Sequence, residues 1–322
     1  MPKKILMYFI ISAFLLVLTV APILADDLSD SLLAASLQGD LEKVQSLISQ
    51  GANVNITDKD GRTPMINAAE KGQTDIVKLL LEKKVLLNVK TKTGESPLIL
   101  AAQNGNTEIV KLILDKSVDA KDYFPALAAA AKNGRLDVVT VFSEKVDFKF
   151  ACIDILCLAA KYGKTDIVKL FIDKEARFNE KAYDSESTEK PAPKWSPLMF
   201  AVANGQTETV KLLVAQKGLD PDSYDETGKN CLMLACEKGL VDITAALLQT
   251  DTYPRRQDKS GWTPLMYAVK SGNIEVVKLI AARLDKGTIA EKNNKGETAL
   301  DLAVAGNQTA IATFLKTVWP KS

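Results

Sequence analysis

The chain has 322 residues, of which 47% are hydrophobic and 25% are charged, and its formal net charge is +1. This balance is ordinary for a globular protein and supplies enough apolar side chains for a core. A net charge so close to zero argues against a chain-wide basic field that would attract nucleic acid. The chain contains no histidine, which excludes a histidine general base, a Ser-His-Asp triad and histidine metal ligands.

The N-terminus has the layout of a secretory signal peptide. Lys3 and Lys4 give it a positive start, residues 5–20 form an uncharged and mostly apolar run, and the small Ala25 precedes acidic residues. The apolar run is shorter than the roughly 20 residues that a membrane-spanning helix needs. We therefore expect residues 1–25 to be a cleaved signal peptide and the chain to be exported, into a bacterial periplasm or beyond. An uncleaved membrane anchor is the alternative.

A unit of about 33 residues repeats along the rest of the chain. In each copy a short alanine-rich segment ends at a glycine, which asparagine replaces in the last copy. The aligned residues are Gly39, Gly72, Gly105, Gly134, Gly163, Gly205, Gly239, Gly272 and Asn307. This period indicates a stacked array of supersecondary units. We expect one repeat domain over residues 26–319 with about nine units, of which the first (28–57) and the last (291–316) are atypical caps.

Each unit carries the start and stop signals of two helices. Thr-Pro and Ser-Pro pairs predict a hydroxyl-bearing N-cap residue followed by proline at the first helical position. These pairs are Thr63-Pro64, Ser96-Pro97, Ser196-Pro197 and Thr263-Pro264. The aligned glycine is predicted to end the first helix in the left-handed conformation, which Asn307 also tolerates. A second helix with an apolar stripe follows. Its first turn carries an acid in every unit but the last, and in five units a lysine lies three residues after that acid, at pairing distance: Lys78, Lys111, Lys169, Lys211 and Lys278. Helices this short are not stable alone, so each unit must bury its stripe against its neighbours.

Two segments carry a family resemblance: DKDGRTPMINAAEKGQTDIVKLLLEKKVLLNVK (58–90) and DKSGWTPLMYAVKSGNIEVVKLI (258–280). They resemble ankyrin repeats, and the resemblance extends over residues 28–316. It implies an all-α repeat solenoid of helix-turn-helix units with short β-hairpin fingers. It also implies protein binding on the concave face formed by fingers and inner helices, with no catalysis and no cofactor.

The chain departs from that family pattern in three ways. The position that usually holds histidine is mostly apolar, which predicts packing in place of a hydrogen-bond ladder; a methionine metal site is the alternative. That column holds Ile66, Ile99, Ala128, Cys157, Met199, Met233, Met266 and Asp301. Units four and five lack the DxxGxTPL finger, so we expect an interrupted groove there. Residues 182–195 are charged and rich in serine and proline, which indicates a surface insertion loop, either a tolerated insertion or an extended finger that contacts the partner.

Four cysteines form two pairs with i, i+5 spacing: Cys152 and Cys157, and Cys231 and Cys236. Within one helix this spacing puts the Cα atoms about 8 to 9 Å apart, beyond the roughly 7 Å limit of a disulfide. We expect buried free thiols. A bridge between Cys152 and Cys157 remains open only if Cys152 precedes the helix.

The resemblance also implies where a partner would bind. The residue before Thr-Pro faces the groove near the finger base, and the residues just before the aligned glycine lie in the groove. The candidates are Arg62, Glu95, Trp195, Lys229 and Trp262 from the first position, and Tyr162 and Lys270 from the second. Tryptophan and arginine dominate interface hot spots. The alternative is that each tryptophan covers an adjacent finger and that the polar positions are merely solvated.

No sequence motif points to catalysis, because there is no GxSxG, no GxGxxG after a strand and no P-loop. The mixed groove charges argue against nucleic acid. The sequence predicts a monomeric protein-binding module with no enzymatic activity, no cofactor and no metal. It contacts a membrane only if its N-terminal segment is retained. A membrane-tethered structural scaffold is the second hypothesis.

Overall fold

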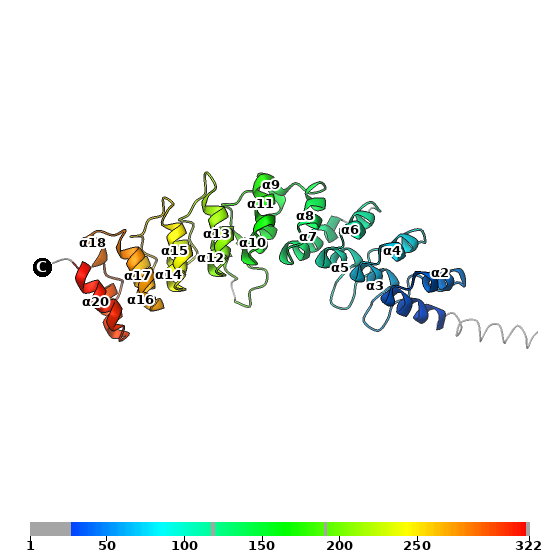
Figure 1. Cartoon of the computed structure of the whole chain (residues 1–322), viewed down its shortest axis with the longest axis horizontal. Helices are drawn as coiled ribbons and strands as arrows, with labels where there is room; N and C mark the ends of the chain where they lie inside the picture. Colours follow the sequence, from blue (N-terminus) through cyan, green and yellow to red (C-terminus); the bar gives the residue numbers. More distant parts are fainter. Residues whose placement is uncertain (1–26, 117–119, 190–191, 320–322) are drawn as a thin grey trace, which may run out of the picture. The chain divides into compact units, whose positions relative to one another are not determined.

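The computed structural model describes residues 27–116, 120–189 and 192–319. The predicted signal peptide, residues 1–25, lies outside these ranges. The chain divides into two compact units, and the boundary falls between Phe142 and Ser143. In both units each full repeat is a pair of helices joined by a tight turn (Figure 1), so the predicted all-α repeat solenoid is confirmed.

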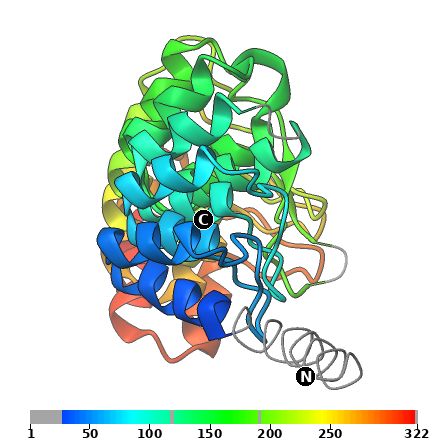
Figure 2. The ribbon, with the colours of Figure 1, turned by 90° about the vertical axis from the view of Figure 1, so that its right-hand side faces the viewer.

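Unit 1 contains a row of inner helices that pack side by side, each followed by an outer helix. In Figure 2 the blue-to-teal helices of this unit lie on one side and the turns between repeats lie on the other. The inner helices are residues 27–38, α3 (Pro64–Lys71), α5 (Pro97–Asn104) and α7 (Tyr123–Lys132). The outer helices are α2 (Leu41–Ser49), α4 (Thr74–Leu81), α6 (Thr107–Leu114) and α8 (Leu136–Ser143), which ends at the boundary.

Unit 2 repeats the same arrangement. Its inner helices are α10 (Ile153–Lys161), α12 (Pro197–Ala203), α14 (Cys231–Glu237), α16 (Pro264–Ser271) and α19 (Ala299–Ala305). Its outer helices are α11 (Thr165–Asp173), α13 (Thr207–Val214), α15 (Val241–Leu247), α17 (Ile274–Ala281) and α20 (Thr309–Val318). The short elements are α9 (Phe148–Ala151), α18 (Lys286–Ile289) and the strands β1 (Ala182–Tyr183) and β2 (Lys194–Trp195).

The predicted N-caps are confirmed. The hydroxyls of Thr63, Ser96, Ser196 and Thr263 each accept a hydrogen bond from the backbone N–H three residues later. Asn230 and Thr298 cap α14 and α19 in the same way. Each repeat therefore fixes the start of its own inner helix with a local side chain.

The aligned glycines are confirmed as left-handed residues, with φ between 64° and 82°, and Asn307 has φ 55°. The structure also gives them a second role that the sequence analysis missed. In five repeats the side chain after the glycine donates to a carbonyl at or just beyond the end of the preceding inner helix, over 2.8 to 3.2 Å. These donors are Gln73, Asn106, Arg135, Gln206 and Asn273. This ladder of side chains ties successive repeats together within each unit, and the missing glycine Cβ leaves room for it.

Most of the apolar column that replaces histidine is packed into the core, as predicted, and Ile99 and Ala128 are half-buried. Ile66, Met199, Met233 and Met266 are buried. The polar member, Asp301, instead forms a capping box with Thr298, whose backbone N–H donates to the Asp301 carboxylate over 2.9 Å. Packing and local caps thus take the place of an inter-repeat histidine bond.

The predicted ion pairs within the outer helices are confirmed in two repeats. Lys211 lies 2.9 Å from Glu208, and Lys278 lies 2.9 Å from Glu275. Lys78 lies 4.0 Å from Glu108 of the next repeat instead. Such exposed pairs add little stability, so helix stripes and the side-chain ladder hold the repeats together.

The predicted β-hairpin fingers are mostly five-residue turns, which we call fingers, and this is a correction. They start at Asp58, Thr91, Asp225, Asp258 and Asn293. In each one the first residue accepts backbone N–H groups of its own turn with its side chain, as Asp58 does from Arg62 over 2.9 Å. Because that side chain takes the N–H groups, little is left for a strand ladder. Within the described ranges only β1 and β2 pair as strands, with isolated bridges in two other fingers.

The predicted interruption of the fingers in units four and five is confirmed. A short 3-10 helix, η1 (Ala120–Asp122), and α9 occupy the places where the fourth and fifth fingers would lie. The insertion loop, residues 182–195, is more ordered at its base than the sequence suggested, because β1 and β2 close it as an antiparallel pair. Residues 190–191 of this loop lie outside the described ranges.

All four cysteines are free and buried, as predicted. Cys152 does precede α10, yet it forms no bridge with Cys157. Burial, followed by the nearby charges of Asp147 and Asp154, raises the pKa of Cys152 to about 11. Burial also raises the pKa of the other three thiols. These residues act as small apolar side chains.

Replacing Gly163 by alanine should destabilise the protein more than replacing Gly205. Both residues have positive φ, which costs a residue with a Cβ about 1 to 2 kcal/mol. A Cβ at Gly163 would also overlap the Gln206 Oε1, whereas a Cβ at Gly205 meets nothing within 4 Å. Displacing Gln206 breaks its bond to Lys161, so the free energy of unfolding in urea should fall by about 1 kcal/mol more. Equal losses, or the same difference when Gln206 is already alanine, would contradict this explanation.

The thiols should be unreactive in the folded protein. Since burial keeps all four protonated, a disulfide-exchange reagent at about pH 8 should react only slowly with the native chain. In denaturant the same reagent should titrate four thiols. Prompt reaction of the folded protein, or fewer than four thiols after unfolding without reductant, would overturn the assignment.

Candidate functional site

Two of the predicted binding residues, Arg62 and Glu95, lie in neighbouring fingers of unit 1. The guanidinium of Arg62 pairs with Glu70 and donates to the Asn67 amide oxygen over 2.8 Å. Glu95 accepts hydrogen bonds from the hydroxyls of Thr93 and Thr91, which lower its pKa. Both side chains are half-buried and already bonded within unit 1.

Three other predicted residues, Lys229, Trp262 and Lys270, come together in unit 2. The ring of Trp262 lies 5.1 Å from the ring of Tyr267, tilted by 45°. The Nζ of Lys229 lies 4.7 Å from the centroid of Tyr267, and the Nζ of Lys270 lies 5.8 Å from that of Trp262. We call these four residues with Glu237 the aromatic–lysine cluster. Fingers supply Lys229 and Trp262, and the inner helices α14 and α16 supply the rest.

Glu237 holds the two lysines in place. Its carboxylate lies 2.6 Å from the Lys229 Nζ and 2.8 Å from the Lys270 Nζ. Burial disfavours the charge of Glu237, but the hydrogen bonds from both lysines outweigh burial and lower its pKa. The Lys270 side chain is still 55% exposed, so it forms the solvent-facing edge of the cluster.

A hydrogen bond to Asp258 fixes the Tyr267 side chain. The Tyr267 hydroxyl donates to the Asp258 carboxylate over 2.6 Å. Asp258 is the first residue of its finger, and its side chain also accepts the backbone N–H of Trp262. Burial, followed by this hydrogen bond, raises the pKa of Tyr267, so the phenol stays protonated at neutral pH. The cluster therefore presents the half-buried Trp262 ring on a rigid base.

The remaining predicted residues, Tyr162 and Trp195, belong to another part of unit 2. The Tyr162 hydroxyl donates to Glu186 over 2.7 Å, and Lys161 lies 2.8 Å from Asp184. Burial opposes the charge on Lys161, but its hydrogen bonds with Asp184 and Glu186 outweigh burial and raise its pKa. These contacts anchor the 182–195 loop to α10.

Trp195 packs inward rather than into a groove. Its ring lies 5.5 Å from that of Phe200 in an edge-to-face arrangement, beside the buried Cys157 and Ala182. Its indole nitrogen is buried and has no hydrogen-bond partner among the described residues. The sequence placed Trp195 and Trp262 in one column, and the structure gives them different surroundings.

A set of exposed and half-buried aromatic and basic side chains at the bases of the unit 2 fingers was not predicted from the sequence. Lys181 and Arg256 lie 4.7 and 4.8 Å from the ring centroid of Tyr224, and Lys194 lies 5.2 Å from that of Tyr183. We call these five residues the finger-base row. A signal was present in the sequence, because Tyr183 and Tyr224 each directly precede the aspartate that begins a finger segment.

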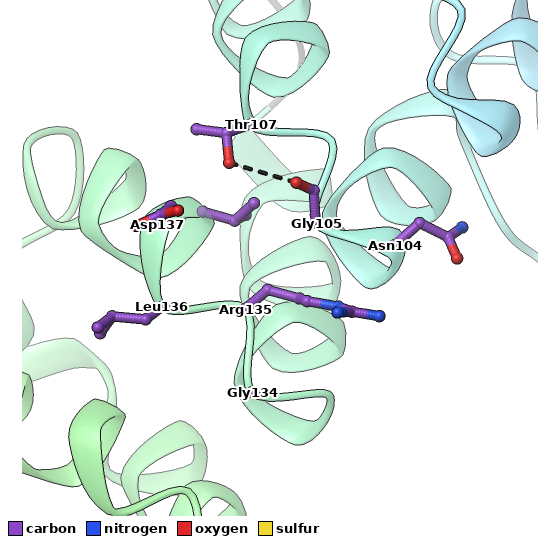
Figure 3. Close-up of a pocket in the computed structure, with 8 residues that line it drawn as sticks. Asn104, Gly105, Thr107, Gly134, Arg135, Leu136 and Asp137 are labelled. Carbon is purple, nitrogen blue, oxygen red and sulfur yellow. Dashed lines mark hydrogen bonds between the residues drawn. The ribbon is translucent and has the colours of Figure 1, made fainter.

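A cavity of about 280 Å³ lies in unit 1 between two helix-turn-helix corners (Figure 3). Asn104, Gly105, Thr107, Gly134 and Arg135 are among its lining residues, and the Thr107 hydroxyl donates to the Gly105 carbonyl over 3.3 Å. Arg135 is committed to the inter-repeat ladder through Gln103. The cavity is explained by that ladder and carries no catalytic constellation.

Over residues 27–319, apart from the two short gaps, no group of three or more cysteine or acidic side chains is arranged to hold a metal ion. In the same part of the chain, none of the helices has the length and apolar character needed to span a bilayer.

Comparison with known proteins identifies the repeats. The family model described as ankyrin repeats (3 copies) matches residues 32–124, 127–225, 156–258, 198–288 and 232–318. The chain is 31% identical over 133 residues to Ankyrin repeat domain-containing protein 63 of Homo sapiens, which is 39% of this chain and 35% of that protein. It is 30% identical over 122 residues to Ankyrin repeat and SAM domain-containing protein 6 of Danio rerio, covering 38% of this chain and 16% of that protein. It is 31% identical over 126 residues to Inversin of Gallus gallus, covering 39% and 11%.

The chain spans between 11% and 35% of the length of these relatives, so the similarity concerns the repeats alone. The family matches together extend over most of residues 32–318. The helix pairs, the left-handed glycines and the family matches agree, and the chain belongs to the ankyrin-repeat family.

Proposed function

We propose that this chain is a protein-binding module that holds its partner on unit 2 through the aromatic–lysine cluster. The observation that carries the proposal is the half-exposed ring of Trp262, which lies on the buried Tyr267 beside the exposed amine of Lys270. Ankyrin repeats support a role as a protein-interaction scaffold. A fixed tryptophan surrounded by polar groups is typical of an interface hot spot.

The energetics of the cluster favour this assignment. Trp262 and Tyr267 are already oriented, so a partner orders few side chains when it binds them. Lys270 and Glu237 form an ion pair at the rim, where a partner's charged group can exchange with either member. The cluster thus combines an apolar anchor with adaptable polar contacts.

The proposal includes no catalytic activity, cofactor or metal. The amines and the carboxylate of the cluster neutralise one another, and the raised pKa of Tyr267 does not suit a general base. The mixed charges also argue against nucleic acid as the partner. We further propose that the protein acts as a monomer.

We propose that the module works after export, in a bacterial periplasm or outside the cell. The support is the layout of residues 1–25, with a basic start, an apolar run and the small Ala25 before acids. The second hypothesis is a membrane-tethered scaffold that keeps its apolar N-terminal run as an anchor.

Replacing Trp262 by alanine should weaken partner binding by about 1 to 4 kcal/mol, because it removes the apolar anchor. The partner is captured from the exported fraction with immobilised wild-type protein, and its affinity is then measured by titration against each variant. Circular dichroism should remain that of the wild type.

Two variants serve as controls for this experiment. Trp262→Phe keeps a ring on Tyr267 and should retain most of the affinity. Trp195→Ala should instead lower the free energy of unfolding, because Trp195 packs on Phe200. Undiminished capture by a folded Trp262→Ala protein would contradict the proposed function.

The mature protein should begin at Asp26. N-terminal sequencing of the protein recovered from the exported fraction measures this directly. Recovery with an intact Met1 or Pro2 in the membrane fraction would favour the tethered scaffold instead.

A further inference from the structure

The cations of the finger-base row are held by aromatic rings, and the Lys181 amine also donates to the backbone carbonyl of Tyr224. Among the residues that the structure describes, no carboxylate lies within 4.0 Å of the charged nitrogens of Lys181, Lys194 or Arg256. This contrasts with the groove lysines, since Lys161, Lys229 and Lys270 each have a carboxylate within 3 Å. The row is therefore a distinct electrostatic feature of unit 2.

The aspartates that flank the two tyrosines of the row are committed to other partners. Asp184 binds Lys161. Asp222 accepts hydrogen bonds from Asn230 and Thr252, each over 2.9 Å. Asp225 accepts the N–H groups of its own finger. Within the described ranges, none of these carboxylates forms an ion pair with a cation of the row.

Two of the cations share a single ring. Lys181 and Arg256 lie at 4.7 and 4.8 Å from the centroid of Tyr224, so the ring attracts both. Bringing two like charges to one ring leaves a repulsion that a bound anion would relieve. The guanidinium of Arg256 also offers the planar fork that carboxylates bind in bidentate fashion.

The tyrosines give the row an apolar and accessible face. Tyr183 is 56% exposed and Tyr224 is 48% exposed. Exposed aromatic rings beside uncompensated cations are suited to a segment that alternates acidic and less polar side chains.

We propose that the finger-base row binds an acidic segment of the partner protein, with carboxylates on Lys181 and Arg256 and neighbouring side chains on Tyr183 and Tyr224. The inference rests on the proposed protein-binding function and names the chemistry of the partner. A peptide fits better than nucleic acid, because Glu186 and Glu226 lie in the same fingers and would repel a long run of phosphates.

The test is fluorescence anisotropy with a short labelled peptide of alternating glutamate and serine. Wild-type protein should bind it, and the double variant Lys181→Gln/Arg256→Gln should bind at least about tenfold more weakly. The matched control is Lys92→Gln/Lys111→Gln, which makes the same change of net charge in unit 1 and should bind like the wild type. Affinity should fall as salt is added.

Further arms separate the alternatives. The glutamine–serine counterpart should not bind, and Tyr224→Phe should bind like the wild type because it keeps the ring. The proposal is overturned if the acidic peptide does not bind the wild-type protein, or if an oligothymidylate of similar length binds more tightly. It is also overturned if the double variant binds the peptide like the wild type, or if the unit 1 control loses as much affinity as the double variant.

Partner capture distinguishes this inference from the proposed function. If the folded Lys181→Gln/Arg256→Gln protein captures the natural partner with wild-type affinity while Trp262→Ala does not, the acidic-segment inference falls and the proposed function survives. If neither variant loses affinity for that partner, both are wrong.

Discussion

The structure depends on one local constraint, the left-handed residue that ends each inner helix. That conformation turns the chain directly into the outer helix, so each repeat closes its helix pair in very few residues. The missing Cβ also leaves room for the side chain of the next repeat, such as Gln206 over Gly163 or Asn106 over Gly72. A single conformational requirement therefore fixes both the shape of a repeat and its bond to the neighbour. This explains why the residue is so regular while its surroundings vary.

The charged side chains of unit 2 fall into two groups, those paired with carboxylates and those held by aromatic rings. Charges that face the inner helices, such as Lys161 and Lys229, are neutralised within the repeats and help to fix loops and rings. Charges at the finger bases are held by aromatic rings, which orient them without cancelling them. In the part of the chain that the structure describes, the second arrangement leaves the positive charge without a neutralising carboxylate. The paired lysines therefore fix the loops and rings of the surface, and the ring-held cations make the finger bases positively charged.

Local chemistry explains which parts of the fold could be predicted from the sequence. The cap at Thr63 and the turn at Gly72 depend on residues within a few positions, so the pattern of one repeat is enough to predict them. The inter-repeat ladder was missed because its donors differ in type: Arg135 and Gln206 make equivalent bonds. The fingers were predicted as hairpins because the family pattern does not reveal that an aspartate side chain takes the N–H groups of the turn.

In the candidate site too, contacts between different positions of the repeat could not be predicted from the sequence. Trp195 and Trp262 occupy one column of the repeat, but the residue five positions later is Phe200 in one case and Tyr267 in the other. Phe200 belongs to a buried apolar cluster, and the partly buried Trp195 packs against that cluster. Tyr267, whose hydroxyl donates to Asp258, packs against the half-buried Trp262, and Lys229 and Lys270 both lie over the Tyr267 ring. What a column position does is thus decided by contacts with other columns. A single sequence therefore predicts the place of a residue within the repeat better than it predicts the contacts that its side chain makes.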